Sequence, residues 1–226
     1  MAANLFLYWG SGSIPCWKPM IVLAEKGISE YGNKLISFSK NEQKSDEILK
    51  LNPRGQVPTF RDGDVVVNES TAICEYLEFK FAEQGATLLP SDAATRGRVL
   101  QRMFETQNLM KTLIEGVAYL FFHNKPEEIN QDELNAKKKA ARTELERWEE
   151  YLKAEGTDSY IVGSQFTMAD VFLFPLLAFG VRGNLNLSSF PAINAYYQRL
   201  EQRPSIQETW PPHWKEGPGT DFCSGI

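Results

Sequence analysis

The chain has 226 residues, of which 42% are hydrophobic and 12% aromatic, so it is long and apolar enough to form a packed protein of one large domain or two small ones. Its 24 lysines and arginines are outnumbered by 29 aspartates and glutamates, and this net charge of −5 argues against nucleic acid or an acidic membrane surface as a partner. No apolar run approaches the length of a membrane span and no signal peptide is recognisable, so we expect a cytoplasmic protein with no membrane partner.

The cysteine and histidine content argues against a metal site. The three cysteines, Cys16, Cys74 and Cys223, are odd in number and lack CxxC spacing, which disfavours a disulfide framework, a zinc site and a dithiol redox motif. The two histidines, His123 and His213, lie far apart in the sequence. We therefore expect no metal cofactor.

The chain begins with a strand, a turn and a helix. An apolar strand is predicted over residues 4–9, and a helical pattern follows a glycine- and serine-rich break and stops at Gly27. Pro15 fits the first helical turn, whereas Pro19 predicts an irregular or kinked start. A second strand is predicted over residues 35–38, parallel to the first.

A hairpin follows, with strands expected at residues 57–60 and 65–67 around an Asp-Gly turn. Pro58 has no N–H, so it belongs on a strand edge or at a strand's first residue, where the main-chain groups of Val57 are free to bind an extended peptide. The hairpin leads into a helix predicted over residues 70–81, with Glu69 and Ser70 at its N-terminus. Exposed N–H groups at that end attract an anion, and Glu69 attracts a cation.

A main-chain edge beside paired anion and cation sites suits the free amino-acid end of a small peptide. The run Asn52-Pro53 to Val57-Pro58, followed by Glu69-Ser70, resembles the cytosolic glutathione transferases. The resemblance implies that Val57, before a cis-Pro58, pairs with the cysteinyl main chain of glutathione and that Glu69 and Ser70 hold the γ-glutamyl end. It further implies contacts from Gln43, Lys44 and Gln56; the first two equally fit a solvated surface helix.

Residues 1–82 therefore have the order βαβαββα of a thioredoxin-like domain, and residues 83–92 form the best linker candidate. Residues 93–226 are predicted to form an all-helical domain with a C-terminal tail, its helices expected at 98–122, 132–154, 167–179 and 192–202. Thr167 and Asp170 have the spacing of a capping box, which we interpret as a folding signal.

Three hydroxyls compete to stabilise the glutathione thiolate, because a hydroxyl at a helix N-terminus favours the charged form of a thiol. Ser13 is the first choice, since Ser13-Ile14-Pro15-Cys16 is similar to the motif of serine-type classes such as theta and zeta. Ser11 is the reserve, between two glycines that allow close approach, and Tyr8 is the third candidate. Cys16 invites comparison with omega-type enzymes but falls three residues after the expected position, so a buried structural thiol is favoured.

The electrophile is expected to bind between the two domains. Residues at helical spacing on the long helix, with an aromatic residue at its end, are candidates for the apolar wall: Met103, Gln107, Met110, Lys111 and Phe122. Residues of these types at such positions more often belong to plain core than to a ligand wall.

The predicted function is that of a glutathione S-transferase, which adds glutathione, its co-substrate, to electrophiles of xenobiotic or lipid-peroxidation origin. The segments Trp9–Ser13 and Asn52–Gln56 look like the rho class of aquatic animals, and family members are homodimers. Two alternatives remain: a non-catalytic protein that binds glutathione or hydrophobic ligands on the same fold, and a thiol oxidoreductase that works through Cys16. The sequence does not identify the physiological electrophile.

Overall fold

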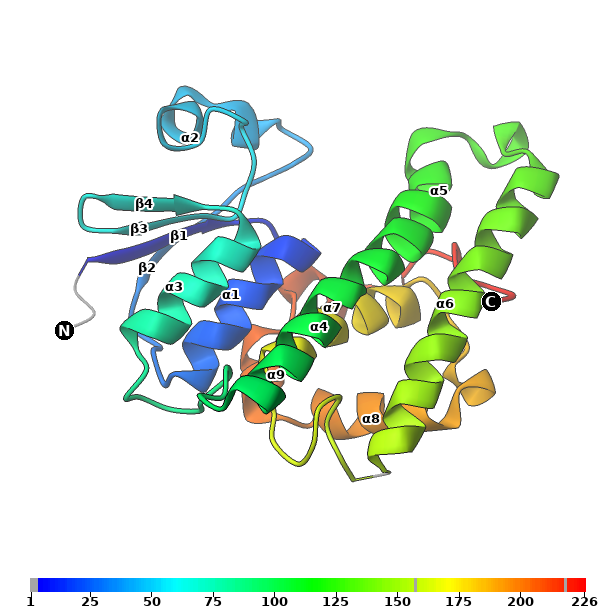
Figure 1. Ribbon diagram of the computed structural model, residues 1–226. Coiled ribbons are helices and arrows are strands. Elements are labelled where there is room, and N and C mark those ends of the chain that lie inside the picture. Colours follow the sequence, from blue (N-terminus) through cyan, green and yellow to red (C-terminus); the bar gives the residue numbers. More distant parts are fainter. Residues whose placement is uncertain (1–3, 157, 218) are drawn as a thin grey trace. The chain divides into compact units, whose positions relative to one another are not determined.

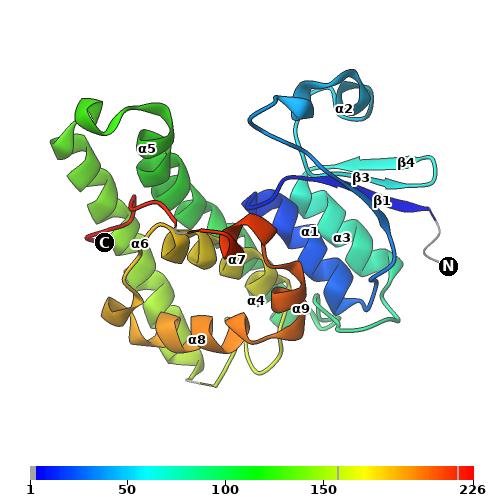
Figure 2. The same ribbon diagram turned by 180° about the vertical axis from the view of Figure 1, so that it is seen from behind.

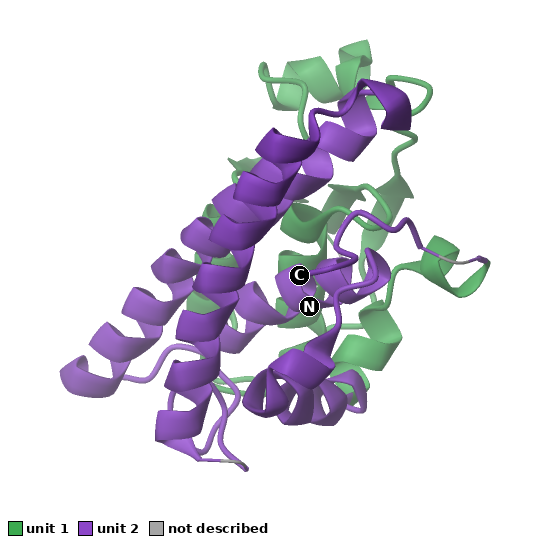
Figure 3. Cartoon of the chain, turned by 90° about the vertical axis from the view of Figure 1, so that its right-hand side faces the viewer, with its two compact units in different colours: residues 1–87, 204–216 green, residues 88–203, 217–226 purple. Residues whose placement is uncertain are grey.

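The computed structural model describes residues 4–156, 158–217 and 219–226, and it divides into two compact units. Unit 1 comprises residues 1–87 and 204–216, and unit 2 comprises residues 88–203 and 217–226 (Figure 3). Residues 204–216, which the sequence analysis kept with the helical domain, thus belong to the first unit. They contain helix α9 (Pro204–Thr209), which packs on helix α1 (Ile14–Glu25).

Unit 1 is built on a four-stranded sheet with the strand order β2-β1-β3-β4, consistent with the predicted thioredoxin-like domain. The strands are β1 (Leu5–Trp9), β2 (Gly32–Leu35), β3 (Thr59–Asp62) and β4 (Val65–Asn68). β1 pairs in parallel with β2 and antiparallel with β3. β3 and β4 form the predicted hairpin, although β3 begins at Thr59, two residues later than expected.

The second strand was misplaced by the sequence analysis. It spans Gly32–Leu35 and overlaps the predicted 35–38 only at Leu35. All four residues of this edge strand are exposed, so it carries no alternating hydrophobic pattern. The apolar residues that suggested a strand lie beyond β2: Ile36 is buried in the core, and Phe38 is in the following loop.

Helices cover both faces of this sheet (Figure 1). α1 and α3 (Ser70–Lys80) lie together on one face, and Pro15 occupies the first turn of α1 as predicted. α1 is assigned as one helix through Pro19, where a kinked start had been expected. The other face carries the 3-10 turn η1 (Glu42–Lys44) and α2 (Asp46–Leu51), whose Ile48 packs against Tyr8 and Ile36.

Unit 2 is helical, as predicted. Its main elements are α4 (Ala93–Leu109), a π-helical segment η2 (Met110–Ala118), α5 (Tyr119–His123), α6 (Gln131–Glu155), α7 (Met168–Arg182) and α8 (Pro191–Glu201), with 3-10 turns η3 (Pro126–Glu128) and η4 (Leu187–Ser189). α7 is buried along most of its length and packs against α4 and α8. α6 runs beside α4 and α8 (Figure 2). The last residues, 217–226, return to this unit, where Phe222 fills the space beside Gly183.

The long helix predicted over residues 98–122 is not a uniform α-helix. From Met110 to Ala118 it widens into π-helix, and a Cβ on Gly116 would lie 3.2 Å from the carbonyl oxygen of Lys111, five residues earlier. The 3.6-residue spacing used to place Met110 and Lys111 on one face with Met103 therefore ends at this segment.

The predicted capping box at α7 is confirmed. The Asp170 carboxylate accepts hydrogen bonds from the main-chain N–H of Thr167 at 2.8 Å and from its hydroxyl at 3.0 Å. Two more donors, the N–H of Ile161 and the hydroxyl of Tyr196, reach the same carboxylate. Burial raises the pKa of Asp170 to about 6, against the lowering effect of these hydrogen bonds.

Candidate functional site

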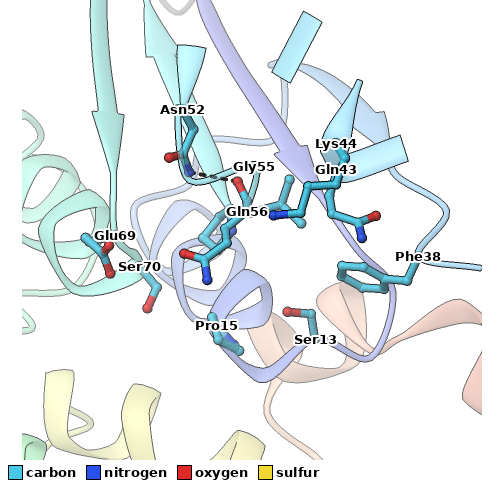
Figure 4. A pocket seen from close by; sticks show the side chains of 12 residues that line it. Ser13, Pro15, Phe38, Gln43, Lys44, Asn52, Gly55, Gln56, Glu69 and Ser70 are labelled. Atoms are coloured by element: carbon cyan, nitrogen blue, oxygen red, sulfur yellow. Dashed lines mark hydrogen bonds between the residues drawn. The ribbon is translucent and has the colours of Figure 1, made fainter. Parts of the chain in front are cut away.

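A pocket of about 480 Å³ opens in unit 1 between the starts of α1 and α3, the loop after β2, the turn η1 and the segment before β3 (Figure 4). Its lining consists of Ser13, Pro15, Phe38, Gln43, Lys44, Asn52, Gly55, Gln56, Val57, Pro58, Glu69 and Ser70. Ser13 and all seven residues that the sequence analysis chose for glutathione are in this set. A volume of this size falls in the usual range for small-molecule sites.

Ser13 reaches the pocket because it is the residue directly before α1. Its N–H donates to the Gly10 carbonyl at 3.2 Å, and its own carbonyl accepts from the Trp17 N–H at 3.0 Å. Ser13 therefore both closes the turn through its N–H and accepts the first hydrogen bond of the helix through its carbonyl. Its hydroxyl lies where the positive end of the helix dipole favours negative charge.

The other two candidate hydroxyls point elsewhere. The Ser11 Oγ lies 2.6 Å from Nδ1 of His213 and does not line the pocket. The Tyr8 hydroxyl donates to Glu47 of α2 at 2.9 Å, and burial together with that carboxylate raises the pKa of Tyr8. Of the three, only Ser13 lines the pocket.

The segment before β3 forms the central wall. The Asn52 amide donates to the Gln56 carbonyl at 2.9 Å and thereby holds the loop that leads to Val57. The Val57-Pro58 peptide bond is cis, as the resemblance implied. Within the described residues, no hydrogen bond to the main chain of Val57 is found, so its N–H and C=O remain available to an extended ligand.

The start of α3 forms one side of the pocket. Glu69 has a left-handed φ of 71°, which is unusual for a residue with a side chain, and its carbonyl accepts the first helical hydrogen bond from Ile73 at 3.0 Å. The Glu69 side chain is 70% exposed, and its ion-pair partner Arg54 is 4.0 Å away. No side chain caps this helix end among the described residues, so its first N–H groups and the Ser70 hydroxyl are open to an anion.

Gln43 and Lys44 face the pocket from the opposite side (Figure 4). The Lys44 ammonium donates to the Arg54 carbonyl at 2.8 Å and packs over Gly55, whose φ is +57°. The Gln43 amide nitrogen donates to Asn41, while its Oε1 is buried with no hydrogen-bond partner among the described residues. An unsatisfied buried polar atom on the pocket lining is available for a ligand donor.

Sequence reasoning missed four lining residues: Pro15, Phe38, Asn52 and Gly55. Phe38 was predicted to lie in a strand, but its ring lies against Gly10, where a Cβ would come within 2.2 Å of it. Asn52 stood in the quoted Asn-Pro motif, and its hydrogen bond to the Gln56 carbonyl gives that motif a physical role. No local sequence signal marked Phe38, because its position depends on how the loop after β2 folds back.

The five residues predicted to bind the electrophile lie in unit 2. Met103 is buried, Met110 is half-buried, and Gln107, Lys111 and Phe122 are exposed. The Phe122 ring contacts Phe179 and Phe222 of the same unit, with ring centroids 6.3 and 5.9 Å away. None of the five lines the pocket of unit 1, and their role stays a prediction.

The three cysteines are buried and free. Burial raises the pKa of Cys16 to about 11 and that of Cys223 to about 12, and it raises that of Cys74 as well. Within residues 4–156, 158–217 and 219–226, no cluster of three or more His, Cys, Asp or Glu side chains suits a metal ion. No helix in this part of the chain combines the length and apolar character needed to cross a membrane.

Comparison with known proteins finds glutathione S-transferases. The chain matches the glutathione S-transferase N-terminal domain over residues 13–79 and the C-terminal domain over residues 109–204. It is 43% identical to glutathione S-transferase A of Pleuronectes platessa, with 100% of both chains covered, and 31% identical to glutathione S-transferase Z2 of Arabidopsis thaliana, covering 96% and 94%. The crystal structure of a glutathione S-transferase from the Antarctic clam Laternula elliptica has a TM-score of 0.89 and 52% identity, covering 98% of this chain and 99% of that one.

Proposed function

The chain belongs to the glutathione S-transferase family and is an enzyme of that type, and from this premise we propose that it joins the sulfur of glutathione to electrophilic carbon atoms. We further propose that glutathione binds in the pocket of unit 1. Foreign compounds and products of lipid peroxidation are the substrate class we favour.

The observation that carries the proposal is the order of groups along this one pocket. Glu69 and Ser70 lie on one side, Gln43 and Lys44 lie on the other, and Ser13 faces the space between them (Figure 4). An extended tripeptide needs its groups recognised in that sequence. The γ-glutamyl end would meet Glu69 and Ser70, the glycine carboxylate would meet Lys44 and the second amide N–H of Gln43, and Gln56 would add a contact from the central wall.

The cysteinyl residue of glutathione would pair with the free main-chain groups of Val57, held by the cis peptide bond to Pro58. Its thiol would then face the Ser13 hydroxyl at the N-terminus of α1. A hydroxyl donor and the positive end of a helix both favour the thiolate over the thiol, so the thiol loses its proton to water more readily.

The reaction follows from that thiolate. Its sulfur attacks the electrophilic carbon, a carbon–sulfur bond forms, and a leaving group such as chloride departs with the bonding electrons. Ser13 keeps donating its hydrogen bond to sulfur and is never consumed. We propose that residues of unit 2, among them Met103, Gln107, Met110, Lys111 and Phe122, bind the electrophile.

The test is conjugation of glutathione to a chlorinated nitrobenzene, with glutathione binding measured by calorimetry on the same protein. Replacing Ser13 by Ala should lower kcat roughly 10²-fold, the typical loss for one donor to a developing or resident anion. Binding without turnover in the wild type would identify a non-catalytic binding protein. If Ser13→Ala retains turnover and Ser11→Ala abolishes it, the assignment within the turn is overturned.

We also propose a homodimer of the rho class. Dimers are typical of the family, and exposed aromatic side chains are available for contact, with Phe79 of α3 87% and Phe104 of α4 58% exposed. The class rests on the sequences Trp9–Ser13 and Asn52–Gln56. Sedimentation of the purified chain tests the dimer, and a monomer at all concentrations would contradict it.

A further inference from the structure

The turn that carries Ser13 is held by a distant segment of the chain. The Ser11 Oγ lies 2.6 Å from Nδ1 of His213, although the two residues are 202 positions apart in sequence. Either atom can donate in this hydrogen bond, depending on the tautomer of the ring. His213 belongs to the 3-10 turn η5 (Pro212–Lys215), which is part of unit 1.

Gly12 supplies a second, independent contact. Its φ of +74° lies in the left-handed region, and a Cβ there would come within 2.7 Å of His213 Cε1 and 2.9 Å of Trp214 Nε1. The imidazole and indole thus pack directly on the main chain of the turn. Only glycine combines this φ with so close an approach.

The same segment is anchored on α1, which begins at the end of the turn. The Trp17 indole donates to the Thr209 hydroxyl at 2.9 Å, and its ring meets those of Trp210 and Trp214 edge to face at 5.3 and 5.5 Å. The buried Trp17 and Trp214 therefore fix η5 relative to α1. His213 is exposed at the end of this aromatic support, where it reaches Ser11.

Phe38 holds the turn at its other end, since a Cβ on Gly10 would lie 2.2 Å from that ring. Phe38 thus packs on this four-residue turn at Gly10, and His213 contacts it at Ser11 and Gly12. The Ser13 N–H closes the turn by donating to the Gly10 carbonyl at 3.2 Å. A shift of Ser11 or Gly12 must move Ser13, because only one residue separates Ser11 from Ser13.

We propose that His213 is a positioning residue: through its hydrogen bond to Ser11 and its packing on Gly12, it keeps the Ser13 hydroxyl aimed at the glutathione sulfur. This inference rests on the proposed function of Ser13. In this proposal Ser11 anchors the turn, and the C-terminal segment affects catalysis through the position of Ser13.

The experiment compares His213→Ala, His213→Asn and Ser11→Ala with the wild type, using His123→Ala as the matched control. His123 is the other histidine, exposed on α5, where its Nδ1 lies 3.0 Å from the Tyr119 carbonyl oxygen and its ring stacks on the Tyr119 ring. His213→Ala should lower kcat roughly three- to tenfold, the rate equivalent of one neutral hydrogen bond, with KM for glutathione changed less than about twofold. His213→Asn should recover much of the loss, because the Asn amide can place a hydrogen-bonding atom where Nδ1 stands. His123→Ala should match the wild type.

Two further readouts separate positioning from a merely structural role. The pKa of the bound glutathione thiol, followed by the ultraviolet absorbance of the thiolate against pH, should rise in His213→Ala, because a misplaced hydroxyl stabilises the thiolate less. The double variant Ser11→Ala with His213→Ala should lose no more than His213→Ala alone, since the bond that Ser11→Ala removes is already absent there.

The outcomes are distinct. A wild type that neither binds nor conjugates glutathione would overturn the proposed function itself. A working wild type whose kcat and thiol pKa are unchanged in His213→Ala would overturn the positioning role alone. Equal losses in His213→Asn and His213→Ala, or additive losses in the double variant, would overturn the hydrogen bond to Ser11 as its basis.

Discussion

Helices α3 and α7 both begin beside an acidic residue, yet the two beginnings are built in opposite ways. At α7 the Asp170 carboxylate is buried and accepts hydrogen bonds from Thr167 and from the Tyr196 hydroxyl at 3.0 Å. At α3 the Glu69 side chain is 70% exposed, and no side chain caps the helix among the described residues.

The difference teaches how to tell a folding signal from a binding site. Every helix leaves its first N–H groups without partners, and something must satisfy them. Where a buried side chain of the protein does so, as at Asp170, the helix start fixes the fold. Where the groups stay open beside a cavity and the main chain holds an unusual φ, as at Glu69 and Ser70, the helix start is the place where we propose that a ligand binds.

The largest effect is expected at α7. Asp170→Ala should lower the free energy of unfolding by roughly 3 kcal/mol or more, because it leaves several buried donors without an acceptor. Denaturant unfolding followed by circular dichroism measures the loss. The control is Asp92→Ala, since Asp92 caps α4 by accepting from the Thr95 N–H at 2.8 Å. That exposed cap should be worth only about 1 kcal/mol, so equal losses in the two variants would contradict the special weight given to Asp170.

The outline of the fold was readable from the sequence because hydrophobic periodicity and turn residues mark long elements well. Helix α3 and the capping box of α7 lie where these signals predicted, and the hairpin turns at the predicted Asp-Gly, although β3 begins two residues later than expected. The failures share a cause. β2 is an exposed edge strand, so its sequence does not alternate between apolar and polar residues. The segment Met110–Ala118 changes from α-helical to π-helical spacing, and no proline marks the change.

The pocket lining was predictable wherever its residues are consecutive in a motif, as at Val57-Pro58 and Glu69-Ser70. The motif favoured Ser13 over Ser11, but it did not give the direction of either side chain, and that direction separates the two residues in the structure. The Ser11 hydroxyl meets His213, far along the chain, and no local pattern encodes that contact with the turn. The place of Phe38 in the pocket lining was likewise not predictable, because it depends on a contact with Gly10, distant in sequence.

At α3, Ser70→Ala should weaken glutathione binding without weakening the fold. The loss of one hydrogen bond to a charged carboxylate should raise KM for glutathione roughly tenfold, while kcat stays near the wild-type value. Steady-state kinetics and thermal melting give the two numbers. Ser189→Ala, which removes an exposed hydroxyl from η4 in unit 2, is the matched control and should change neither. A drop in stability comparable with that of Asp170→Ala would break the distinction between the two helix starts.

A pair of substitutions at Glu69 separates its charge from its main-chain conformation. Glu69→Gln removes the charge and keeps a side chain at φ 71°, so glutathione binding should weaken with little change in stability. Glu69→Gly should weaken binding to a similar extent and also raise the free energy of unfolding by about 0.5–1 kcal/mol, because glycine adopts this φ readily. Calorimetry and denaturant unfolding distinguish the two. If Glu69→Gly is no more stable than Glu69→Gln, the unusual φ carries no cost to the fold.

The smallest expected effect is on the reactivity of Cys16, which lies three residues after Ser13. Cys16 is buried in α1, whereas Ser13 lines the pocket. Because burial raises the pKa of Cys16 to about 11 and that of Cys223 to about 12, both thiols should stay protonated and unreactive toward a disulfide reagent up to about pH 9 in the folded protein. Unfolded thiols ionise near pH 8.5, so the stabilising effect of these protonated thiols is complete below that pH and is lost as the pH rises toward 11. Unfolding in denaturant should therefore release three reactive thiols where the native chain shows none. A native thiol that reacts rapidly at neutral pH, together with loss of activity in Cys16→Ser, would instead support chemistry through Cys16.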